Sequence, residues 1–294
     1  MLGMWILVSG LVAVSASTRP ASRPATLLVA PTTAPAKSAA TTSAATEPGA
    51  TQMSGDPAVD RILERLERRG DEVHSLTSEL QADFLDVVVD DKQSRLGSIW
   101  FRRDKPNPKF KVVYRKSIFG DVETDDKHEY LFDGEYLIEK HYRSTNWQKR
   151  QIVAKGEKIE PFRIGKGPFP LPFGQKKAEI LEHFVVTRIR RSAKDPRRTD
   201  HLKLVPCEDS SMAEQYAELH FYIDKKLQLP VRVVAHQFRP GSKDVDEIVT
   251  VTFTDLKINP GVSDDVLMIP KPKGKDWHCT EERLPDTAAP PTKR

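Results

Sequence analysis

Histidine, cysteine and carboxylate side chains are the groups in this 294-residue sequence with the chemistry for catalysis or metal binding. The eight histidines occur singly, and none forms the H-E-x-x-H pair that presents two imidazoles to zinc from one face of a helix. The sequence also lacks the G-x-S-x-G nucleophile elbow, the P-loop and the G-x-G-x-x-G dinucleotide fingerprint. We therefore predict that the protein is not an enzyme and has neither a metal site nor a cofactor.

Three smaller groups of reactive or charged residues have structural interpretations. The carboxylate pairs at 90–91 and 125–126 are predicted to flank turns, and His141 and His236 to be ordinary residues of strands. The densest basic stretch, residues 188–198, is either a docking patch for anionic lipid or an acidic partner, or a solvated sheet edge protected by charge. We favour the sheet edge.

The two cysteines leave one question open. Cys207 follows a predicted strand and Cys279 lies in the C-terminal segment. In an oxidising compartment a disulfide between them would close a loop and fix the tail to the sheet. The sequence does not give their separation in space, so pairing and non-pairing both stand.

Composition excludes several classes of protein. With 38% hydrophobic and 30% charged residues the chain can build a core, and no apolar run approaches the roughly 20 residues of a membrane-spanning helix. Two cysteines are too few for a disulfide-dense scaffold or a four-cysteine zinc module. Residues 1–55 carry three basic side chains and one acidic side chain; removing that +2 from the total of +4 leaves +2. A charge so near neutrality argues against a nucleic-acid partner.

The chain divides into four segments. Residues 1–16 are apolar and end in small residues, which is typical of a signal peptide for export. No Lys or Arg precedes the apolar run, so an uncleaved N-terminal anchor is the alternative. Residues 17–55 and 281–294 are low in large apolar residues and are predicted to be a disordered linker and tail. Residues 56–280 are predicted to form one folded domain.

The hydrophobic pattern of the folded part predicts the α+β class. Asp56 and Pro57 mark the start of an amphipathic helix that ends at Gly70. After it, apolar residues recur every second position, as in strands. Predicted strands cover 76–89, 96–103, 110–115, 129–132, 136–142, 148–153, 184–191, 200–205, 218–224, 230–238 and 247–258, and short helices 175–183 and 212–216. We expect a strongly curved antiparallel sheet, an open half-barrel, with the helices as a lid over an apolar cavity.

Several weak motifs occur in an order that matches a known family. They are Glu64-Arg65-Leu66, LQADF at 80–84, GSIWFRR at 97–103, the Asp133-Gly134 turn, PFPLPFGQ at 168–175 and FYID at 221–224. Over residues 57–277 the chain resembles the LolA-like periplasmic carriers of outer-membrane lipoproteins. The resemblance implies a half-open curved sheet that shields lipoprotein acyl chains during passage across the periplasm. It also implies a monomer whose partners are an acylated lipoprotein, an inner-membrane release complex and an outer-membrane acceptor.

The resemblance and the alternation of apolar residues along the strands together predict which residues form the site. The predicted lipid-binding cavity is lined by Leu80, Phe84, Ile99, Phe101, Phe110, Val112 and Tyr114. Arg103 aligns with the family arginine that holds the lid closed, and Leu66 with the helix leucine that it contacts; Arg102 is an equal candidate one residue away. The inserted residues at 104–105 depart from the family pattern, so the identity of the client lipoprotein is not predicted. The alternative function is a non-carrier of the same fold, an envelope sensor or protein-interaction module tethered at the membrane.

Overall fold

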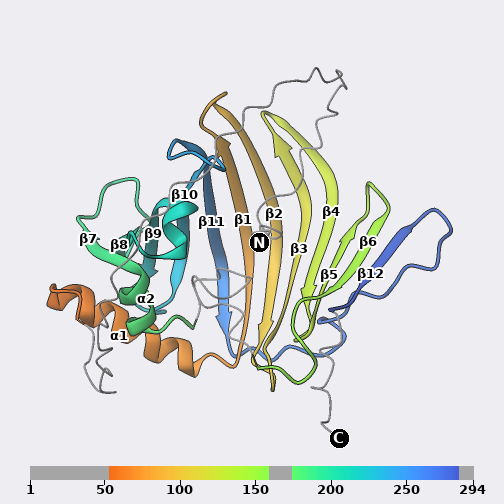
Figure 1. Cartoon of the computed structure of the whole chain (residues 1–294), viewed down its shortest axis with the longest axis horizontal. Coiled ribbons are helices and arrows are strands. Elements are labelled where there is room, and N and C mark those ends of the chain that lie inside the picture. Colours follow the sequence, from red (N-terminus) through yellow and green to blue (C-terminus); the bar gives the residue numbers. More distant parts are fainter. Residues whose placement is uncertain (1–52, 159–173, 285–294) are drawn as a thin grey trace, which may run out of the picture.

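A computed structural model describes residues 53–158 and 174–284 (Figure 1). The predicted signal segment 1–16, nearly all of the linker 17–55, residues 168–173 of the predicted lid and most of the tail 281–294 lie outside these ranges. In the part described, the chain forms a 12-stranded sheet, two α-helices and a 3-10 helix. Neither α-helix among these residues has the length and apolar character needed to cross a lipid bilayer.

The elements follow one another along the chain in two halves. The first half contains α1 (Pro57–Glu72), β1 (Ser75–Asp86), β2 (Asp91–Arg102), β3 (Lys109–Phe119), β4 (Val122–Phe132), β5 (Tyr136–His141) and β6 (Asn146–Gln151). The second half contains α2 (Lys177–His183), β7 (Phe184–Ile189), β8 (Thr199–Pro206), η1 (Ser211–Glu214), β9 (Tyr216–Asp224), β10 (Pro230–Phe238), β11 (Val245–Ile258) and β12 (His278–Glu282).

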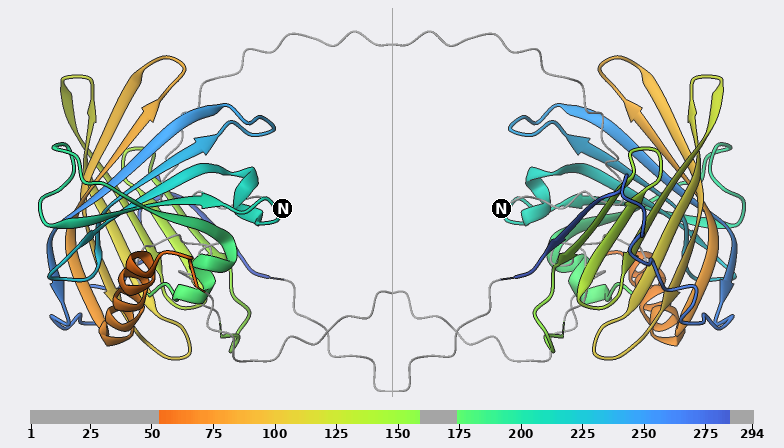
Figure 2. Two further views of the ribbon diagram at one scale, coloured as in Figure 1. Left: turned by 90° about the vertical axis from the view of Figure 1, so that its left-hand side faces the viewer. Right: turned by 90° about the vertical axis from the view of Figure 1, so that its right-hand side faces the viewer.

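The sheet joins two antiparallel meanders at its centre. Its strand order is β12-β6-β5-β4-β3-β2-β1-β11-β10-β9-β8-β7, so the first strand of the chain pairs with β11. All neighbouring strands are antiparallel except β12, which runs parallel to β6. The sheet is strongly curved and does not close, because β12 and β7 are its two edges (Figures 1 and 2). The predicted fold class is confirmed.

Helix α1 begins as the sequence predicts. Asp56 is its N-cap and accepts a hydrogen bond from the Ala58 amide at 2.7 Å, with proline at the first position. A stripe of apolar side chains at helical spacing is buried, which explains why this segment is a helix that packs on the sheet. The stripe consists of Val59, Ile62, Leu63 and Leu66. The helix ends at Glu72, just beyond the predicted end at Gly70.

Alternation along the strands gives the sheet two different faces. We call the face that packs with α1 the inner face; in β1 it carries Leu80, Ala82 and Phe84. The opposite, outer face is polar over much of β1 and β2. Over β4–β6 it is covered by the segment before β12, in a second apolar cluster of Leu131, Ile138, Trp147, Val262, Leu267 and Ile269.

The structure corrects four details of the sequence interpretation. Strand β4 starts at Val122, so residues 125–126 lie within a strand and do not flank a turn. The irregularity in β1 lies between Thr77 and Glu79 and not near Phe84. Strand β12 extends to Glu282, past the predicted end of the fold at 280. Cys207 and Cys279 are free thiols near opposite edges of the sheet, which rules out the predicted option of a disulfide.

The basic stretch at 188–198 covers the end of β7 and the loop to β8. Strand β7 is an edge strand, and most of these residues are exposed. Arg188 lies 3.3 Å from Asp200 of β8. This position agrees with the interpretation as a charged sheet edge.

The backbone of β3 leaves no room for a side chain at Gly97 of β2, and this generates a prediction. A Cβ atom at this position would lie 2.2 Å from the Val113 carbonyl oxygen. We expect Gly97→Ala to lower the free energy of unfolding by about 2 kcal/mol, because the backbones must separate at the centre of the sheet. Urea denaturation measures the change. Gln81→Ala, on the exposed outer face of β1, should change it by less than about 0.5 kcal/mol; equal effects of the two substitutions would contradict the interpretation.

Candidate functional site

The predicted cavity residues lie together on the inner face of three neighbouring strands. β1 contributes Leu80 and Phe84, and β2 contributes Ile99 and Phe101. β3 contributes the remaining members, and the Phe101–Phe110 pair is one rung of the sheet. All seven belong to one apolar cluster with α1 and with Ile180 of α2. The structure thus brings the predicted residues together; that they enclose a ligand stays a prediction.

The predicted cavity residues are closed to solvent in this conformation. Phe110 is 0% exposed and Ile99 is 1% exposed. The two helices lie toward the β7 side of the sheet, where they pack on each other and on β7 (Figures 1 and 2). A ligand therefore reaches the inner face only after covering elements move away.

A buried arginine on β2 interrupts the apolar inner face. Arg95 pairs with Ala82 of β1 and is 5% exposed. Its guanidinium lies 5.4 Å from the centre of the Phe84 ring and 6.0 Å from that of Tyr114. Cation–π attraction of this kind stabilises a positive charge beside apolar side chains. Burial raises the pKa of Tyr114 to about 12, so its hydroxyl is neutral and able to donate a hydrogen bond.

Two histidines and two carboxylates of β4 and β5 share the inner face with Arg95. Asp126 Oδ1 lies 2.8 Å from His128 Nε2, and the His128 and His141 rings are 4.4 Å apart. His141 Nε2 lies 3.7 Å from a Glu139 carboxylate oxygen. We call Arg95, Asp126, His128, Glu139 and His141 the inner polar cluster.

Two members of the inner polar cluster, Asp126 and His128, differ in charge near neutral pH. Burial lowers the pKa of His128, and the neighbouring His141 lowers it further, against the opposing effect of Asp126. Burial acts to raise the pKa of Asp126, but the hydrogen bond from His128 and the charge of the same ring outweigh it, and the pKa is lowered. Near neutral pH the cluster therefore presents an ionised carboxylate beside a neutral imidazole. Such groups can hydrogen-bond a polar ester or amide.

Sequence reasoning assigned no role to the inner polar cluster. Its only signal is the alternation of His128 with Tyr130 and of Glu139 with His141, each two positions apart. Polar residues at alternate positions normally indicate the solvent side of a strand. Here both faces of β4 and β5 are covered, so the alternation does not reveal which face is the inner one.

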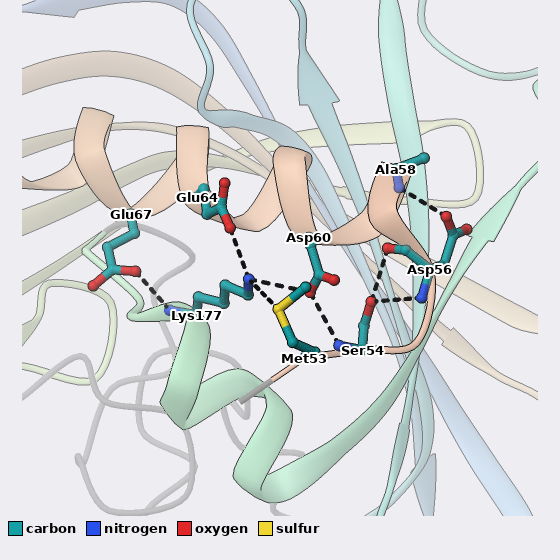
Figure 3. A network of polar contacts seen from close by, with 8 residues as sticks. All are labelled: Met53, Ser54, Asp56, Ala58, Asp60, Glu64, Glu67 and Lys177. Atoms are coloured by element: carbon teal, nitrogen blue, oxygen red, sulfur yellow. Dashed lines mark hydrogen bonds and ion pairs between the residues drawn. The ribbon is translucent and has the colours of Figure 1, made fainter. Parts of the chain in front are cut away.

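Helices α1 and α2 are joined by a lysine that lies between acidic side chains (Figure 3). The Lys177 ammonium lies 3.2 Å from Asp60 and 2.8 Å from Glu64, both on α1. The Lys177 amide also donates to the Glu67 carboxylate at 3.2 Å. Both the Lys177 and the Asp60 side chains are about 5% exposed. We call these four residues the α1–α2 network.

Hydrogen bonds stabilise the charged forms of Asp60 and Lys177. The Ser54 amide donates to Asp60 at 3.0 Å, and this bond, together with Lys177, lowers the pKa of Asp60 despite burial. The pKa of Lys177 is raised by Glu64, and next by Asp60, despite burial. Removing one member of such a shielded pair leaves the other charge without compensation.

The two candidate gate arginines point to different parts of the molecule. Arg103 Nη2 donates to the Gly70 carbonyl at 2.8 Å, near the C-terminal end of α1. Arg102 pairs with Asp104 and Asp264 and donates to the Val262 carbonyl at 2.7 Å. Arg103 is thus the arginine that contacts the helix.

Gly70 also fixes the approach of α1 to the chain that leads into α2. A Cβ atom on Gly70 would lie 2.9 Å from Gly174 Cα, so only glycine permits this spacing. Leu66, one turn earlier on α1, is fully buried in the inner cluster. The residues predicted as a gate therefore lie where α1 meets the sheet; their gating role stays a prediction.

No protein-family model matches the chain, and no curated protein matches it. Solved structures similar to it include lipoprotein LppX of Mycobacterium tuberculosis, with 13% identity over 71% of this chain and 98% of that one, at a TM-score of 0.41. An uncharacterized conserved protein of Thermus thermophilus has 12% identity, covers 76% and 99%, and has a TM-score of 0.40. A putative outer membrane lipoprotein-sorting protein domain of Vibrio parahaemolyticus has 10% identity, covers 71% and 96%, and has a TM-score of 0.33. With identities and TM-scores this low, function has to be inferred from this chain's own side chains.

The α1–α2 network generates a prediction about helix opening. We expect Lys177→Met to increase amide hydrogen exchange in α2 at least tenfold at neutral pH, because α2 then loses its ion pairs with α1 and the buried Asp60 carboxylate is left without a cation. Hydrogen exchange with mass spectrometry measures the rates. Lys226→Met, at an exposed turn, is the matched control and should leave them unchanged. Unaltered exchange in Lys177→Met would show that the network does not hold α2.

The lowered pKa of Asp60 generates a second prediction, about how α2 responds to low pH. Since the folded-state pKa lies below the unfolded value of about 4, the stabilisation is complete above that pH and is lost as pH falls through the folded-state value. We expect α2 amide NMR shifts to change as the pH falls below about 4 in the natural protein. In Asp60→Asn this transition should be absent, while Asp71→Asn, at an exposed position of α1, should retain it. The same transition in all three proteins would exclude Asp60 as its cause.

Proposed function

We propose that the protein is an exported, monomeric carrier that binds the acyl chains of a lipoprotein on the inner face of its sheet. The observation that supports it best is the inner face itself, where an apolar surface on β1–β3 lies beside a partly buried polar cluster. This combination is complementary to an amphiphile, whose chains are apolar and whose linkage region is polar. The proposal involves binding and release, and no chemical step.

Burial of acyl chains supplies ample binding free energy. Each methylene transferred from water contributes about 0.8 kcal/mol, so one chain of roughly 16 carbons contributes about 13 kcal/mol. A carrier with that affinity needs a way to release its ligand. In our proposal α1 and α2, whose apolar side chains belong to the same cluster as the cavity residues, supply it by moving, because the free energy that holds them in place is subtracted from the free energy of binding.

The inner polar cluster would hold the polar end of the ligand. Arg95 and His128 lie next to Phe84 and Tyr114 of the apolar face. In our proposal the acyl chains lie along the predicted cavity residues and the ester or amide groups hydrogen-bond to the cluster. This orientation would leave the protein part of a lipoprotein toward the outside.

Opening would take place at α1 and α2. Arg103 holds the end of α1, and the α1–α2 network joins the two helices. A few polar contacts of this kind make a closed state of modest stability, which a membrane partner can shift. We propose loading from an inner-membrane release complex, diffusion through the periplasm and delivery to an outer-membrane acceptor.

Binding of a diacylated lipopeptide tests the proposal. We expect 1:1 binding in native mass spectrometry, and at least about 100-fold weaker binding of the same peptide without acyl chains, since the methylenes supply the free energy. Val112→Trp fills the inner face and should weaken lipopeptide binding about tenfold or more, whereas Thr254→Trp, on the exposed outer face of β11, should not. Equal binding of both peptides would overturn the proposal and favour a protein-interaction module.

A further inference from the structure

A second group of histidines lies on the outer face, far along the sheet from the inner polar cluster. Leu219 and Phe221 of β9 belong to the inner apolar cluster, so the alternate residues Glu218 and His220 lie on the outer face. On β10, His236 is paired directly with Glu218. The register therefore brings one carboxylate and two imidazoles to the same spot on the outer face.

The donor atoms of these three residues converge. His220 Nε2 lies 2.9 Å from Glu218 Oε1, and His236 Nδ1 lies 3.9 Å from the same oxygen. The three donor atoms all lie within 4.8 Å of one another. Ligands of a tetrahedral zinc ion are about 3.4 Å apart, as follows from bonds of about 2.1 Å. Small side-chain rotations would therefore bring all three donors to one ion.

The second nitrogen of His220 is already oriented. His220 Nδ1 lies 2.8 Å from His201 Nε2, and His201 Nδ1 lies 3.4 Å from Asp195 Oδ2. His201 is 8% exposed, so the series of contacts from His220 through His201 to Asp195 is shielded from solvent. Metal-bound histidines usually have their other ring nitrogen fixed by a hydrogen bond, and here a histidine and a carboxylate occupy that role.

A cationic side chain already lies beside Glu218. Lys203 forms an ion pair with the second carboxylate oxygen of Glu218, and its ammonium supplies the positive charge at this place.

We propose that Glu218, His220 and His236 bind a divalent transition-metal ion of the zinc type. His201 is the positioning residue that orients His220, and Lys203 is a competing cation. Its side chain is 34% exposed, so it can move into solvent when the ion binds. The three ligands leave a fourth position for water or for a side chain of a partner. The site is separate from the lipid-binding proposal, because it lies on the opposite face of the sheet.

Titration of the tag-free, chelator-treated protein with Co²⁺ tests the site. We expect one Co²⁺ per chain, with the visible absorption of a four-coordinate ion, and displacement by Zn²⁺. His236→Gln and His220→Ala should each weaken binding at least tenfold, and His201→Phe by about tenfold, with altered absorption. The matched control His74→Ala, at an exposed position before β1, should bind normally.

Lys203→Met provides an independent readout and covers the case in which a ligand variant misfolds. It leaves all three ligands in place and removes the competing charge, so we expect Co²⁺ to bind at least threefold more tightly than in the natural protein. Circular dichroism of each variant checks the fold. Binding that His220→Ala and His236→Gln leave unchanged would overturn the proposal. So would failure of both the natural protein and Lys203→Met to bind Co²⁺.

Discussion

A sheet of 12 strands with one apolar face is wider than the helices that accompany it can cover. At about 4.8 Å per strand its width would exceed 50 Å if it were flat, whereas α1, with 16 residues, is about 24 Å long and α2 has only 7 residues. Curvature reduces the mismatch, because it folds the apolar face around its own concave side. The need to bury this face accounts for the bend of the sheet and for the position of the helices, and the proposed binding of an amphiphile rests on the same face.

Polar contacts hold α1 and α2 at the margin of the apolar face. Buried apolar area supplies most of the stability of such a fold, but it does not set when a helix moves. The α1–α2 network and the contact from Arg103 to Gly70 are directional, few in number and sensitive to charge. An element held in this way can open without unfolding the sheet, because the strands on either side keep their ladder hydrogen bonds.

The two polar clusters show how one sheet can support separate chemistry on its two faces. The inner polar cluster lies on β2, β4 and β5, and the histidines of the outer face lie on β8, β9 and β10. In each cluster, polar residues two positions apart along one strand lie on the same face of the sheet. The strand register then places a polar residue of the neighbouring strand beside them. His128 meets His141 in this way, and His236 meets Glu218. Neither arrangement is visible as a linear motif, since the partners are 13 and 18 residues apart.

The sequence by itself determined the fold class and most of the elements. The cap at Asp56, the spacing of Leu63 and Leu66 in α1, and the alternation through Phe110 and Val112 are local signals that act over a few residues, and the structure confirms what they predicted. Only the tertiary structure decided the pairing of β1 with β11, the parallel addition of β12 and the separation of the two cysteines. It also decided that Arg103 contacts α1 while Arg102 does not. These features depend on contacts between residues far apart in the chain, and such contacts are set by which packing buries the apolar face, which a local pattern cannot specify.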